Sequence, residues 1–568
     1  MMEGVRLILL DGGGDSLDWG AGQVVTVGGN LASVRSALDD WGASGSEPAA
    51  LCWDATLGRP PGLQLIGELL ATGWDVWHAG LRLGMGGRPH ILASVTPTWM
   101  LQADPNPEVE ATSWRLSLRA CLVRREVVMR LGGLPSGFRT LEIAGLEMGH
   151  RWIRHGARMR HVPGLLGPSD AAPPSRVAGE ISGNGVGAAN EGEVEDALRF
   201  VRRRHGRRWL GWAAFRAVWT RQAPFRKWLR AWWRVRREPS VPAPPPLRQP
   251  AQCESVPEQG VPDVPGRGVT VLIPTVDRYP YLKVLLGQLG KQTLPVKEVV
   301  VVDQTRVERR ETSWVEAFPE LPLRVVTLEV PGQCSSRNRG LRMATGEMVL
   351  FLDDDDEVGP DLVERHLRHL DRTGAGVSCG VADEVGAGPL PPEFRLARMS
   401  DVFPTNNTMI RREVLERSGL FDLAYDRGQR ADGDLGMRLY LSGAKMLLDP
   451  TISVLHHHAP AGGLRTHGAR VVTRAGSRRR LFQRHLASVW DIYRGLRYFP
   501  RNEVREMLWI NAVGTLSGEG GGWRRALRMV LALVSLPHTV WVLHRRWTEA
   551  NDMLGRFPQI PQTGEREE

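Results

Sequence analysis

The chain has 568 residues, of which 42% are hydrophobic and 24% charged, and its formal net charge is +10; this size predicts several domains with large cores. The five cysteines are scattered without motif spacing, which argues against a disulfide scaffold and is typical of a reducing cytoplasm. Arginine is concentrated in two segments, which suits an anionic surface, but no nucleic-acid reader motif accompanies the charge, so we expect no nucleic-acid partner.

Residues 1–170 are predicted to form one domain that opens with the apolar strand Val5–Leu10. The glycine run at 11–14 lacks the Lys-Ser/Thr pair that follows in a phosphate loop, so it predicts a tight turn. A second strand, at 49–53, leads to Asp54. A single acid is a poor site for a divalent metal, so this domain carries no predicted metal centre.

Residues 171–267 combine a basic, tryptophan-rich helical segment with a proline-rich linker at 239–264. The helical part, at 197–237, places many arginines among Trp209, Trp212, Trp219, Trp228, Trp232 and Trp233. Amphipathic helices of this composition lie well at an anionic membrane surface. The alternative is a pair of helices that pack on their own domain, and the sequence leaves both interpretations open.

Residues 268–465 alternate strand and helix patterns, which predicts an α/β fold with a mainly parallel sheet. The predicted strands lie at 269–275, 298–303, 323–328 and 348–352. A helix after the first strand carries leucines at helical spacing, namely Leu282, Leu285, Leu286 and Leu289.

Four aspartates, 353–356, follow the buried strand at 348–352, and Asp303 ends a second strand. Carboxylates at the carboxyl ends of parallel strands face the crevice where such sheets bind ligands. Clustered carboxylates repel one another unless a hard cation joins them, and Mg²⁺ or Mn²⁺ usually takes one or two carboxylates plus substrate phosphates. The pattern therefore predicts a metal–diphosphate site, with an exposed acidic loop as the alternative.

Several motifs stand in a fixed order over residues 268–460 and together resemble the family 2 glycosyltransferases, which have the GT-A fold. They are Ile273-Pro-Thr275 with Arg278, Val302-Asp-Gln-Thr305, Ser336-Arg-Asn-Arg-Gly-Leu341, Ala344-Thr-Gly-Glu347, Leu352-Asp-Asp-Asp-Asp356, Asn406-Asn-Thr-Met-Ile-Arg-Arg-Glu413, Gly419-Leu-Phe-Asp422 and Asp432-Gly-Asp-Leu435. The resemblance implies an inverting enzyme that moves a sugar from a nucleoside diphosphate sugar to a hydroxyl acceptor, in cell-surface polysaccharide or glycolipid assembly. It also implies Mg²⁺ or Mn²⁺ as cofactor.

The resemblance assigns donor-side roles residue by residue. Thr275 and Arg278 are implied to contact the nucleobase, and Arg337 a diphosphate or base. Asp303 is implied to hold the base or ribose, and its alternative role is to cap the following turn.

The implied metal ligands are Asp355, as the first choice, and Asp353, which also lies on the substrate side. A histidine of the run at 456–458, represented by His457, is implied to complete the metal site. The alternative for these histidines is an ordinary surface strand end.

Family members usually carry a Glu-Asp pair at the start of an acceptor-side helix, whereas this chain has Ala431-Asp432. Asp432 is therefore the predicted catalytic base, because one carboxylate must deprotonate the acceptor hydroxyl. Asp434 is the fallback base and a substrate-binding candidate. Asp432 could instead be only the N-cap of this helix.

The first half of the chain repeats the second at an offset of 287 residues, as the match of Leu122-Val-Arg-Arg-Glu-Val127 to Met409-Ile-Arg-Arg-Glu-Val414 shows. At this offset Gly145 stands where Asp432 stands. We therefore predict tandem domains, the first a degenerate GT-A-like copy that serves as a scaffold or positions the acceptor. It has no clear equivalent of the strand that ends in Asp303.

Residues 466–568 form a basic helical tail that is predicted to cover the acceptor site or to rest on a membrane. Its apolar stretch at 529–543 is shorter than the roughly 20 residues of a membrane span. The expected partners are the sugar donor, a glycan or lipid-linked acceptor and an anionic membrane surface. We expect a cytoplasmic protein, peripheral at the inner membrane face, because no signal peptide is visible. The alternative functions are a non-catalytic scaffold that binds glycan or nucleotide, and a nucleotidyltransferase of similar fold.

Overall fold

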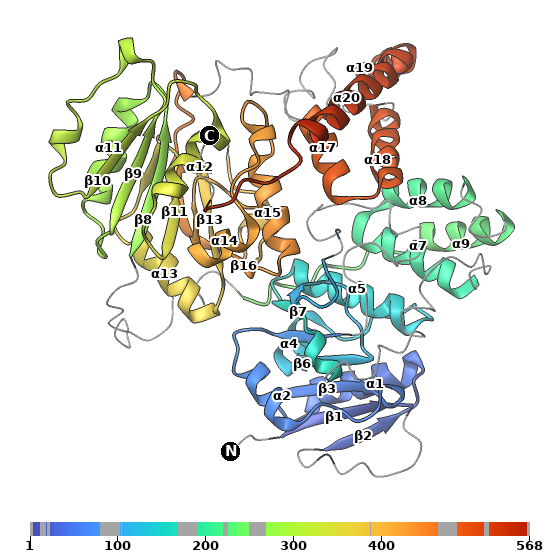
Figure 1. Cartoon of the computed structure of the whole chain (residues 1–568). Coiled ribbons are helices and arrows are strands. Elements are labelled where there is room, and N and C mark those ends of the chain that lie inside the picture. Colours follow the sequence, from blue (N-terminus) through green and yellow to red (C-terminus); the bar gives the residue numbers. More distant parts are fainter. Residues whose placement is uncertain are drawn as a thin grey trace.

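The computed structural model describes residues 4–11, 19, 23–79, 103, 105–167, 191–219, 225–248, 268–386, 388–463, 486–515 and 522–564. Figure 1 shows two α/β lobes, blue to cyan and green to orange, with α7–α9 and the red carboxyl-terminal helices beside them. The predicted turn at 12–14, the stretch at 169–190, most of the proline-rich linker and the basic residues at 478–480 lie outside the described ranges.

The carboxyl-terminal lobe is built on a nine-stranded sheet in the order β10-β9-β8-β11-β15-β13-β16-β12, with β14 paired to β16. The strands are β8 Val269–Thr275, β9 Glu298–Asp303, β10 Leu323–Thr327, β11 Met348–Phe351, β12 Asp356–Val358, β13 Val377–Glu384, β14 Arg398–Met399, β15 Thr408–Arg411 and β16 Met446–His456. The first four in the sheet order run parallel, whereas β15 is antiparallel to both β11 and β13. The α/β class is as predicted, but the sheet is mixed rather than mainly parallel.

Helices cover this sheet through apolar faces, and they are α11 Tyr279–Leu289, α12 Gln333–Met343, α13 Leu362–Thr373, α14 Arg412–Ser418 and α15 Ala431–Leu441. The four leucines predicted to share a face of α11 are all buried. Gly340 lets α12 pack closely, because a Cβ there would lie 2.1 Å from Leu272 Cδ1. These contacts hold α12, which carries Arg337, against β8 and β9.

The amino-terminal lobe has a seven-stranded sheet in the order β2-β1-β3-β6-β4-β7-β5. The strands are β1 Val5–Leu10, β2 Val24–Val27, β3 Ala49–Asp54, β4 Val76–His78, β5 Ala111–Thr112, β6 Ala120–Arg124 and β7 Met159–His161; the helices are α1 Leu31–Ser44, α2 Leu63–Leu70, α4 Arg125–Leu131 and α5 Leu141–Arg154. β2 lies parallel to β1 as β9 lies parallel to β8. The expectation that no equivalent of β9 exists was therefore wrong, although β2 ends without an acid.

The 287-residue offset recurs in the placement of elements. It relates α4 to α14 and β5 to β14 at both ends of each element. The carboxylate of Asp54, at the end of β3, already has protein partners, because it accepts hydrogen bonds from Thr56 and from Arg119 Nε at 2.6 Å. Among the described residues of the amino-terminal lobe, Asp54 thus stands without a cluster of acids like the one at 353–356.

The two lobes contact each other through equivalent positions. A Cβ on Gly156 would lie 2.8 Å from Ala397 O, and a Cβ on Gly443 would lie 2.2 Å from Glu110 O. Gly156 and Gly443 are 287 residues apart, and so are Glu110 and Ala397. The interface is therefore related to itself by a pseudo-twofold, as the isologous interface of a homodimer is.

The tryptophan-rich segment forms α7 Glu191–His205, α8 Arg207–Trp219 and α9 Phe225–Arg237. Phe200 of α7 is buried and stacks on Trp114 of the amino-terminal lobe, with ring centroids 5.8 Å apart. Trp228 is buried in α9, whereas Trp233 is 44% exposed. The segment packs on its own lobe, which is the second of the two interpretations, and α9 keeps some apolar side chains at the surface.

The tail forms α17 Val489–Tyr498, α18 Arg501–Gly514, α19 Gly522–Val534 and α20 Leu536–Arg556. α17 begins at a capping box between Ser488 and Asp491. After α20 the chain returns to the carboxyl-terminal lobe, where Leu420 N donates to Pro561 O over 2.8 Å (Figure 1). The tail is therefore anchored at both ends.

Glu298, at the start of β9, ties the parallel strands together. It accepts hydrogen bonds from Thr270 Oγ1 at 2.7 Å, from Arg324 Nη1 at 2.8 Å and from Thr345 N. Burial opposes ionisation, but these bonds outweigh it and lower the pKa of Glu298 to about 2. We expect Glu298→Gln to lower the free energy of unfolding by about 1–3 kcal/mol in urea titrations.

The sign of the pH effect follows from the lowered pKa. The contribution of Glu298 is complete above its ordinary value of 4.5 and is lost as the pH falls toward about 2. The difference between wild type and Glu298→Gln should therefore shrink in acid. The control is Glu311→Gln, which breaks an exposed pair with Lys283 and should change little. Equal effects of the two variants at neutral pH would contradict the assignment.

Candidate functional site

The carboxyl ends of β8, β9 and β11 lie side by side because β8 pairs in parallel with both neighbours. Thr275, the last residue of β8, is the register partner of Asp303, the last residue of β9. The acidic run at 353–356 begins two residues after β11. The structure thus brings the predicted acids of two strands to one edge of the sheet.

Asp354 is buried and joins the acidic run to β8. Thr275 Oγ1 donates to Asp354 Oδ2 over 2.7 Å, and Arg278 Nη1 donates to Asp354 Oδ1 over 2.9 Å. Burial raises the pKa of Asp354 to about 7, against the opposing effect of Arg278 and Thr275. The polar groups of Thr275 and Arg278, which were predicted to contact a nucleobase, are engaged here by the acidic run.

Asp355 is only 1% exposed, yet one of its oxygens is incompletely satisfied. Oδ2 accepts a hydrogen bond from Ala459 N at 2.7 Å. Oδ1 has Arg278 Nη1 at 3.0 Å and His456 Nδ1 at 3.7 Å, but no described residue donates a hydrogen bond to it. An anionic oxygen therefore lies between two cationic groups with coordination capacity to spare.

Buried Asp356 and partly buried His456 form a pair beside Asp355. His456 Nδ1 donates to Asp356 Oδ1 over 2.9 Å, and Asp353 N donates to Asp356 Oδ2 over 2.8 Å. Burial raises the pKa of Asp356 to about 7. Burial lowers the pKa of His456, but the bond to Asp356 outweighs it and raises that pKa to about 9. The imidazole is thus a cation at neutral pH.

Asp353 is the most accessible member of the run, with its side chain 30% exposed. Arg337 Nη2, on α12, donates to Asp353 Oδ1 over 2.9 Å. The prediction that only a hard cation relieves the repulsion in this cluster was wrong, because Arg278, Arg337 and His456 already balance it. The acids are also not an exposed loop, since three of the four are buried.

His457, the predicted metal ligand, points away from the acidic run. It contacts Glu357, and its ring lies 5.7 Å from that of Tyr281. The strand register explains the difference, because Asp356 of β12 pairs with His456 of β16 and side chains alternate between faces. His456, another member of the histidine run predicted to complete the metal site, is the histidine next to Asp355.

Asp303 is buried and acts as the turn cap that its alternative interpretation predicted. Its Oδ1 accepts from Thr305 N at 2.9 Å, and its Oδ2 accepts from Tyr279 Oη at 2.8 Å. Both oxygens therefore have a protein donor. A contact between Asp303 and a base or ribose stays a prediction.

Asp432, the predicted base, is exposed in the first turn of α15. It is not the N-cap, because Arg430 holds that position with a left-handed φ of 78°. Within the described part of the chain, no side chain bonds to the Asp432 carboxylate. Arg494 of α17 lies alongside, 2.2 Å from where a Cβ on Gly433 would be. The Asp432 carboxylate is thus exposed, within the described residues, beside the guanidinium of Arg494.

Asp434 is fully buried and serves the packing of the tail. It accepts from Arg438 Nε at 3.0 Å and from Tyr498 Oη, on α17, at 2.7 Å. This geometry argues against Asp434 as the base or as a substrate contact, because both roles need an accessible carboxylate. Sequence spacing alone could not reveal the distant partner Tyr498.

The loop before α15, at 425–428, is attached to the start of α12. Asp426 Oδ1 accepts from Cys334 N at 2.8 Å and from Ser335 N at 2.7 Å, at the start of α12. Gln333 Nε2 donates to Tyr425 O and Gly428 O. α12 therefore carries Arg337 to the acids at one side and holds the chain that leads to Asp432 at the other.

The residues present fit a shared metal site rather than a complete protein cage. Among the described residues, no three His, Cys, Asp or Glu side chains are grouped so as to hold a metal ion by themselves. Asp353 and Asp355 do offer carboxylate oxygens, and Oδ1 of Asp355 lacks a donor. Two such ligands with a substrate diphosphate suit Mg²⁺ or Mn²⁺.

Comparison with known proteins agrees with this arrangement. Residues 270–422, from β8 through the chain after α14, match the model of Glycosyl transferase family 2. This part of the chain is a family 2 glycosyltransferase domain, and its α/β fold is GT-A. The family match stops short of Asp432 and of the histidines at the end of β16.

Three relatives show how far the similarity reaches. An uncharacterized glycosyltransferase of Bacillus subtilis, YwdF, is 31% identical over 18% of this chain and 38% of its own length. The poly(ribitol-phosphate) beta-N-acetylglucosaminyltransferase TarS of Staphylococcus aureus is 26% identical over 31% of this chain and 33% of its own length. The succinoglycan biosynthesis protein ExoO of Rhizobium meliloti is 27% identical over 28% and 52%. The chain thus spans about a third to a half of the length of these relatives.

Solved structures with local similarity include S. aureus TarS 1–349 in complex with UDP-GlcNAc, with 19% identity, a TM-score of 0.32, and coverage of 48% of this chain and 81% of that one. The mannosyltransferase PcManGT of Pyrobaculum calidifontis, in complex with GDP-Man and Mn²⁺, has 20% identity, a TM-score of 0.31, and coverage of 55% and 93%. TM-scores this low carry no weight, so the assignment depends on the family match and the strand order.

Proposed function

We propose that the carboxyl-terminal lobe transfers a sugar, with inversion at the anomeric carbon, from a nucleoside diphosphate sugar to a hydroxyl group. The acceptor would be a glycan or lipid-linked glycan in the assembly of a cell-surface polysaccharide or glycolipid, at the cytoplasmic face of the membrane. The family match and the names of relatives such as TarS and ExoO support this proposal.

The observation that carries the proposal is the set of groups around Asp355. An acidic run with three of its four members buried lies at the carboxyl edge of parallel strands and is flanked by Arg278, Arg337 and His456. Such an edge is where open α/β sheets bind nucleotides. Cationic side chains next to the acids can meet diphosphate oxygens, since a guanidinium donates to phosphate with two parallel hydrogen bonds.

Asp353 and Asp355 would hold Mg²⁺ or Mn²⁺ together with the donor diphosphate, and the metal would supply charge neutralisation of the departing diphosphate. Arg278 would release the acids and contact the donor, and Arg337 would orient it from α12. Asp432 would accept the proton of the acceptor hydroxyl as that oxygen attacks. Neighbouring Arg494 would hold the acceptor side in place.

For the amino-terminal lobe we propose a scaffold role as a degenerate copy of the catalytic lobe. The shared 287-residue offset in elements and at the interface supports this proposal, as does the local pairing of Asp54 with Arg119. The pseudo-twofold contact would fix the acceptor-side helix α15, because Tyr440 Oη bonds to Ala103 O at 3.3 Å.

A thermal-shift screen of the wild-type protein tests the function. UDP-, GDP- and dTDP-sugars are compared with and without Mn²⁺. One donor should raise the unfolding temperature by several degrees, and only with the metal. Stabilisation by a nucleoside triphosphate instead would favour a nucleotidyltransferase. Stabilisation by glycan or nucleotide without transfer of sugar would favour a non-catalytic scaffold.

A further inference from the structure

Helix α19 presents an apolar face to solvent. Ala532 is the one buried residue within its span. Trp523, Leu527, Val530 and Val534 recur at intervals of four, three and four residues, so they share one side of the helix. Trp523 is 70% and Val534 75% exposed. The side chains of this apolar stripe have no partner within the described part of the chain that would bury them.

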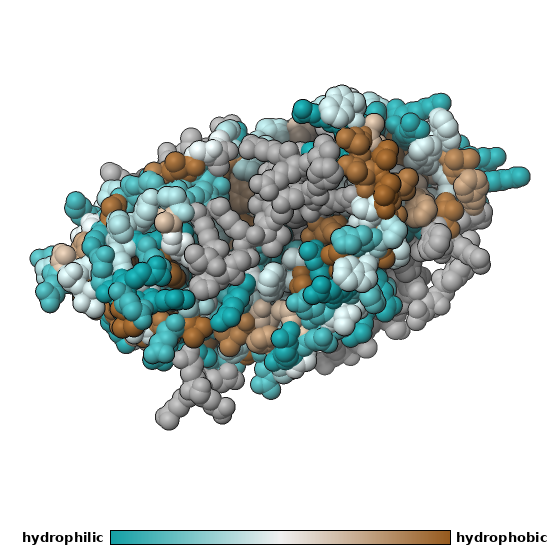
Figure 2. Space-filling view, turned by 90° about the horizontal axis from the view of Figure 1, so that it is seen from above, coloured by the Kyte–Doolittle hydropathy of each residue, from teal (hydrophilic) through white to brown (hydrophobic). Residues whose placement is uncertain are grey.

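The apolar patch continues onto neighbouring helices. Further exposed large side chains are Met529 and Leu533 on α19, Val540 and Trp541 on α20, and Trp509 and Val513 on α18. Seen from above, Figure 2 shows a brown patch on the side where Figure 1 places α19 and the start of α20. A contiguous patch of this kind marks an interaction surface rather than scattered surface residues.

The charge around the stripe has one sign. Residues 522–548 contain five arginines and no aspartate or glutamate. By helical periodicity Arg524 lies about a quarter turn from the stripe, and Arg525 and Arg528 lie toward the opposite, polar side of α19. An apolar face with tryptophan, opposite a polar side rich in arginine, is the composition of a helix that lies in an anionic lipid interface.

The shape of the tail favours lying on a membrane over crossing it. Within the described residues, no single helix is long and apolar enough to span a bilayer, and α19 with α20 passes that test only as a pair bent by 61°. A bend of this size at Ser535 sends α20 back toward α17, against which it packs. Because of this bend, α19 and the first turn of α20 lie together at one surface of the tail.

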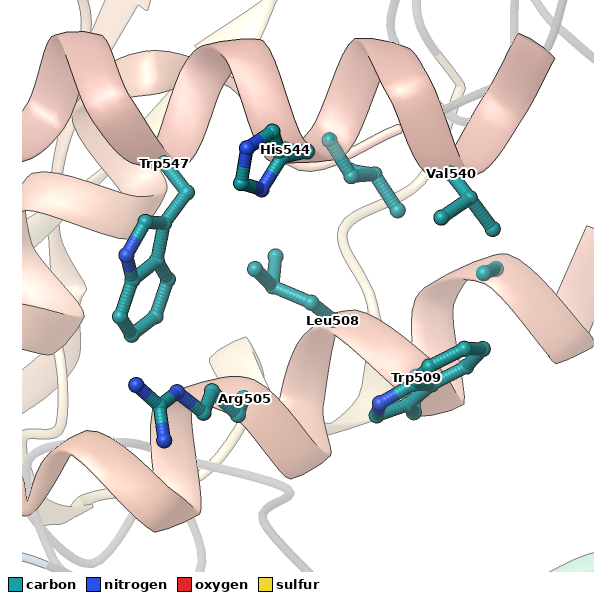
Figure 3. A pocket seen from close by; sticks show the side chains of 8 residues that line it. Arg505, Leu508, Trp509, Val540, His544 and Trp547 are labelled. Atoms are coloured by element: carbon teal, nitrogen blue, oxygen red, sulfur yellow. The ribbon is translucent and has the colours of Figure 1, made fainter. Parts of the chain in front are cut away.

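A groove between α18 and α20 adjoins this surface. It has a volume of about 260 Å³ and is lined by Arg505, Leu508, Trp509, Ala512, Val540, Leu543, His544 and Trp547. Figure 3 shows Leu508, His544 and Trp547 pointing into the space between the two helices. Val540 and Trp509 belong both to this groove and to the exposed patch.

We propose that α19 and the start of α20 dock on an anionic lipid bilayer. The apolar stripe enters the boundary between headgroups and acyl chains, the arginines of the polar side reach up to lipid phosphates, and the groove between α18 and α20 receives the end of an acyl chain. Because the charged side chains of residues 522–548 are all arginines, we expect the partner to be an anionic lipid surface. Membrane binding is measured without sugar donor or acceptor, so the result is independent of whether the protein transfers a sugar.

Co-sedimentation of the full chain with vesicles tests the proposal. We expect binding to phosphatidylcholine–phosphatidylglycerol vesicles, weakened several-fold by added salt, and much weaker binding to phosphatidylcholine alone. Val530→Glu with Leu533→Glu should reduce the bound fraction by about tenfold or more, because two carboxylates would enter the lipid interface. Replacement of Arg524, Arg525 and Arg528 by glutamine should abolish the preference for anionic lipid.

The matched control is Val284→Glu with Val385→Glu, which adds the same charges at valines 48% and 51% exposed on the catalytic lobe. This control should bind vesicles as the wild type does. Binding by the α19 variant equal to that of the wild type would overturn the proposal, as would a wild type that binds neither vesicle. A wild-type dimer that the α19 variant converts to monomer, without vesicle binding, would assign the face to a second copy and also overturn it.

Discussion

Asp432→Asn is expected to lower the rate of sugar transfer by about 10²–10⁴-fold, because the acceptor hydroxyl loses its general base. Donor binding and the unfolding midpoint should stay unchanged, since Asp432 is exposed and within the described residues has no side-chain partner. The measurement is the initial rate of diphosphate release in the presence of acceptor, with donor affinity determined in parallel.

Asp434→Asn is the matched comparison, two residues further along α15. It removes the charge that balances buried Arg438 and weakens the bond from Tyr498. Breaking a buried pair costs about 3–5 kcal/mol, so this variant should lose stability first. Equal transfer rates in Asp432→Asn and wild type would contradict the assignment of the base. A loss of activity in Asp434→Asn with full stability would move the base to that residue.

Arg278→Gln is expected to destabilise the ligand-free protein strongly. Arg278 Nη1 lies 2.9 Å from Asp354 Oδ1 and 3.0 Å from Asp355 Oδ1, and both carboxylates are buried. Without the guanidinium the two carboxylates lose their shared counter-charge, which should lower the free energy of unfolding by about 3 kcal/mol. Part of this loss is relieved by protonation of Asp354, whose pKa burial already raises to about 7.

Mn²⁺ should then stabilise Arg278→Gln more than the wild type, because the ion no longer competes with a bound guanidinium for Asp355. Urea titrations with and without Mn²⁺ measure both effects. Arg309→Gln is the control, since it breaks an ion pair with Asp277 whose arginine side chain is 61% exposed, and should cost less than about 1 kcal/mol. An Arg278→Gln protein as stable as wild type and indifferent to Mn²⁺ would show that the acids are not held by this residue.

Local patterns were enough to predict the elements that build the donor edge. Long apolar runs such as Glu298–Asp303 are strands because valines bury on both faces, and the acid at the end of each run needs no tertiary information. The alternation of strands and helices along the chain also predicted that the acidic run after β11 and Arg337 on α12 lie at the same edge of the sheet. The family model independently covers residues 270–422.

Other features of the fold and the site depend on contacts between segments far apart in the sequence, and local patterns did not predict them. The antiparallel insertion of β15 between β11 and β13 makes the sheet mixed. The register of β12 on β16, a hundred residues apart, selects His456 over His457. Tyr498, in the tail, donates a hydrogen bond to buried Asp434. Arg278, which was expected to contact a nucleobase, pairs with Asp355 in this structure. None of these choices has a local signal.

Calorimetric titration of UDP and GDP, with and without Mn²⁺, into the wild type and Asp355→Ala tests the central claim most directly. One of the two nucleotides should bind the wild type at least about tenfold more tightly with Mn²⁺, a gain of about 1.4 kcal/mol, and Asp355→Ala should lose that gain. Nucleotide affinities that change neither on addition of Mn²⁺ nor in Asp355→Ala would contradict a metal–diphosphate site at Asp355.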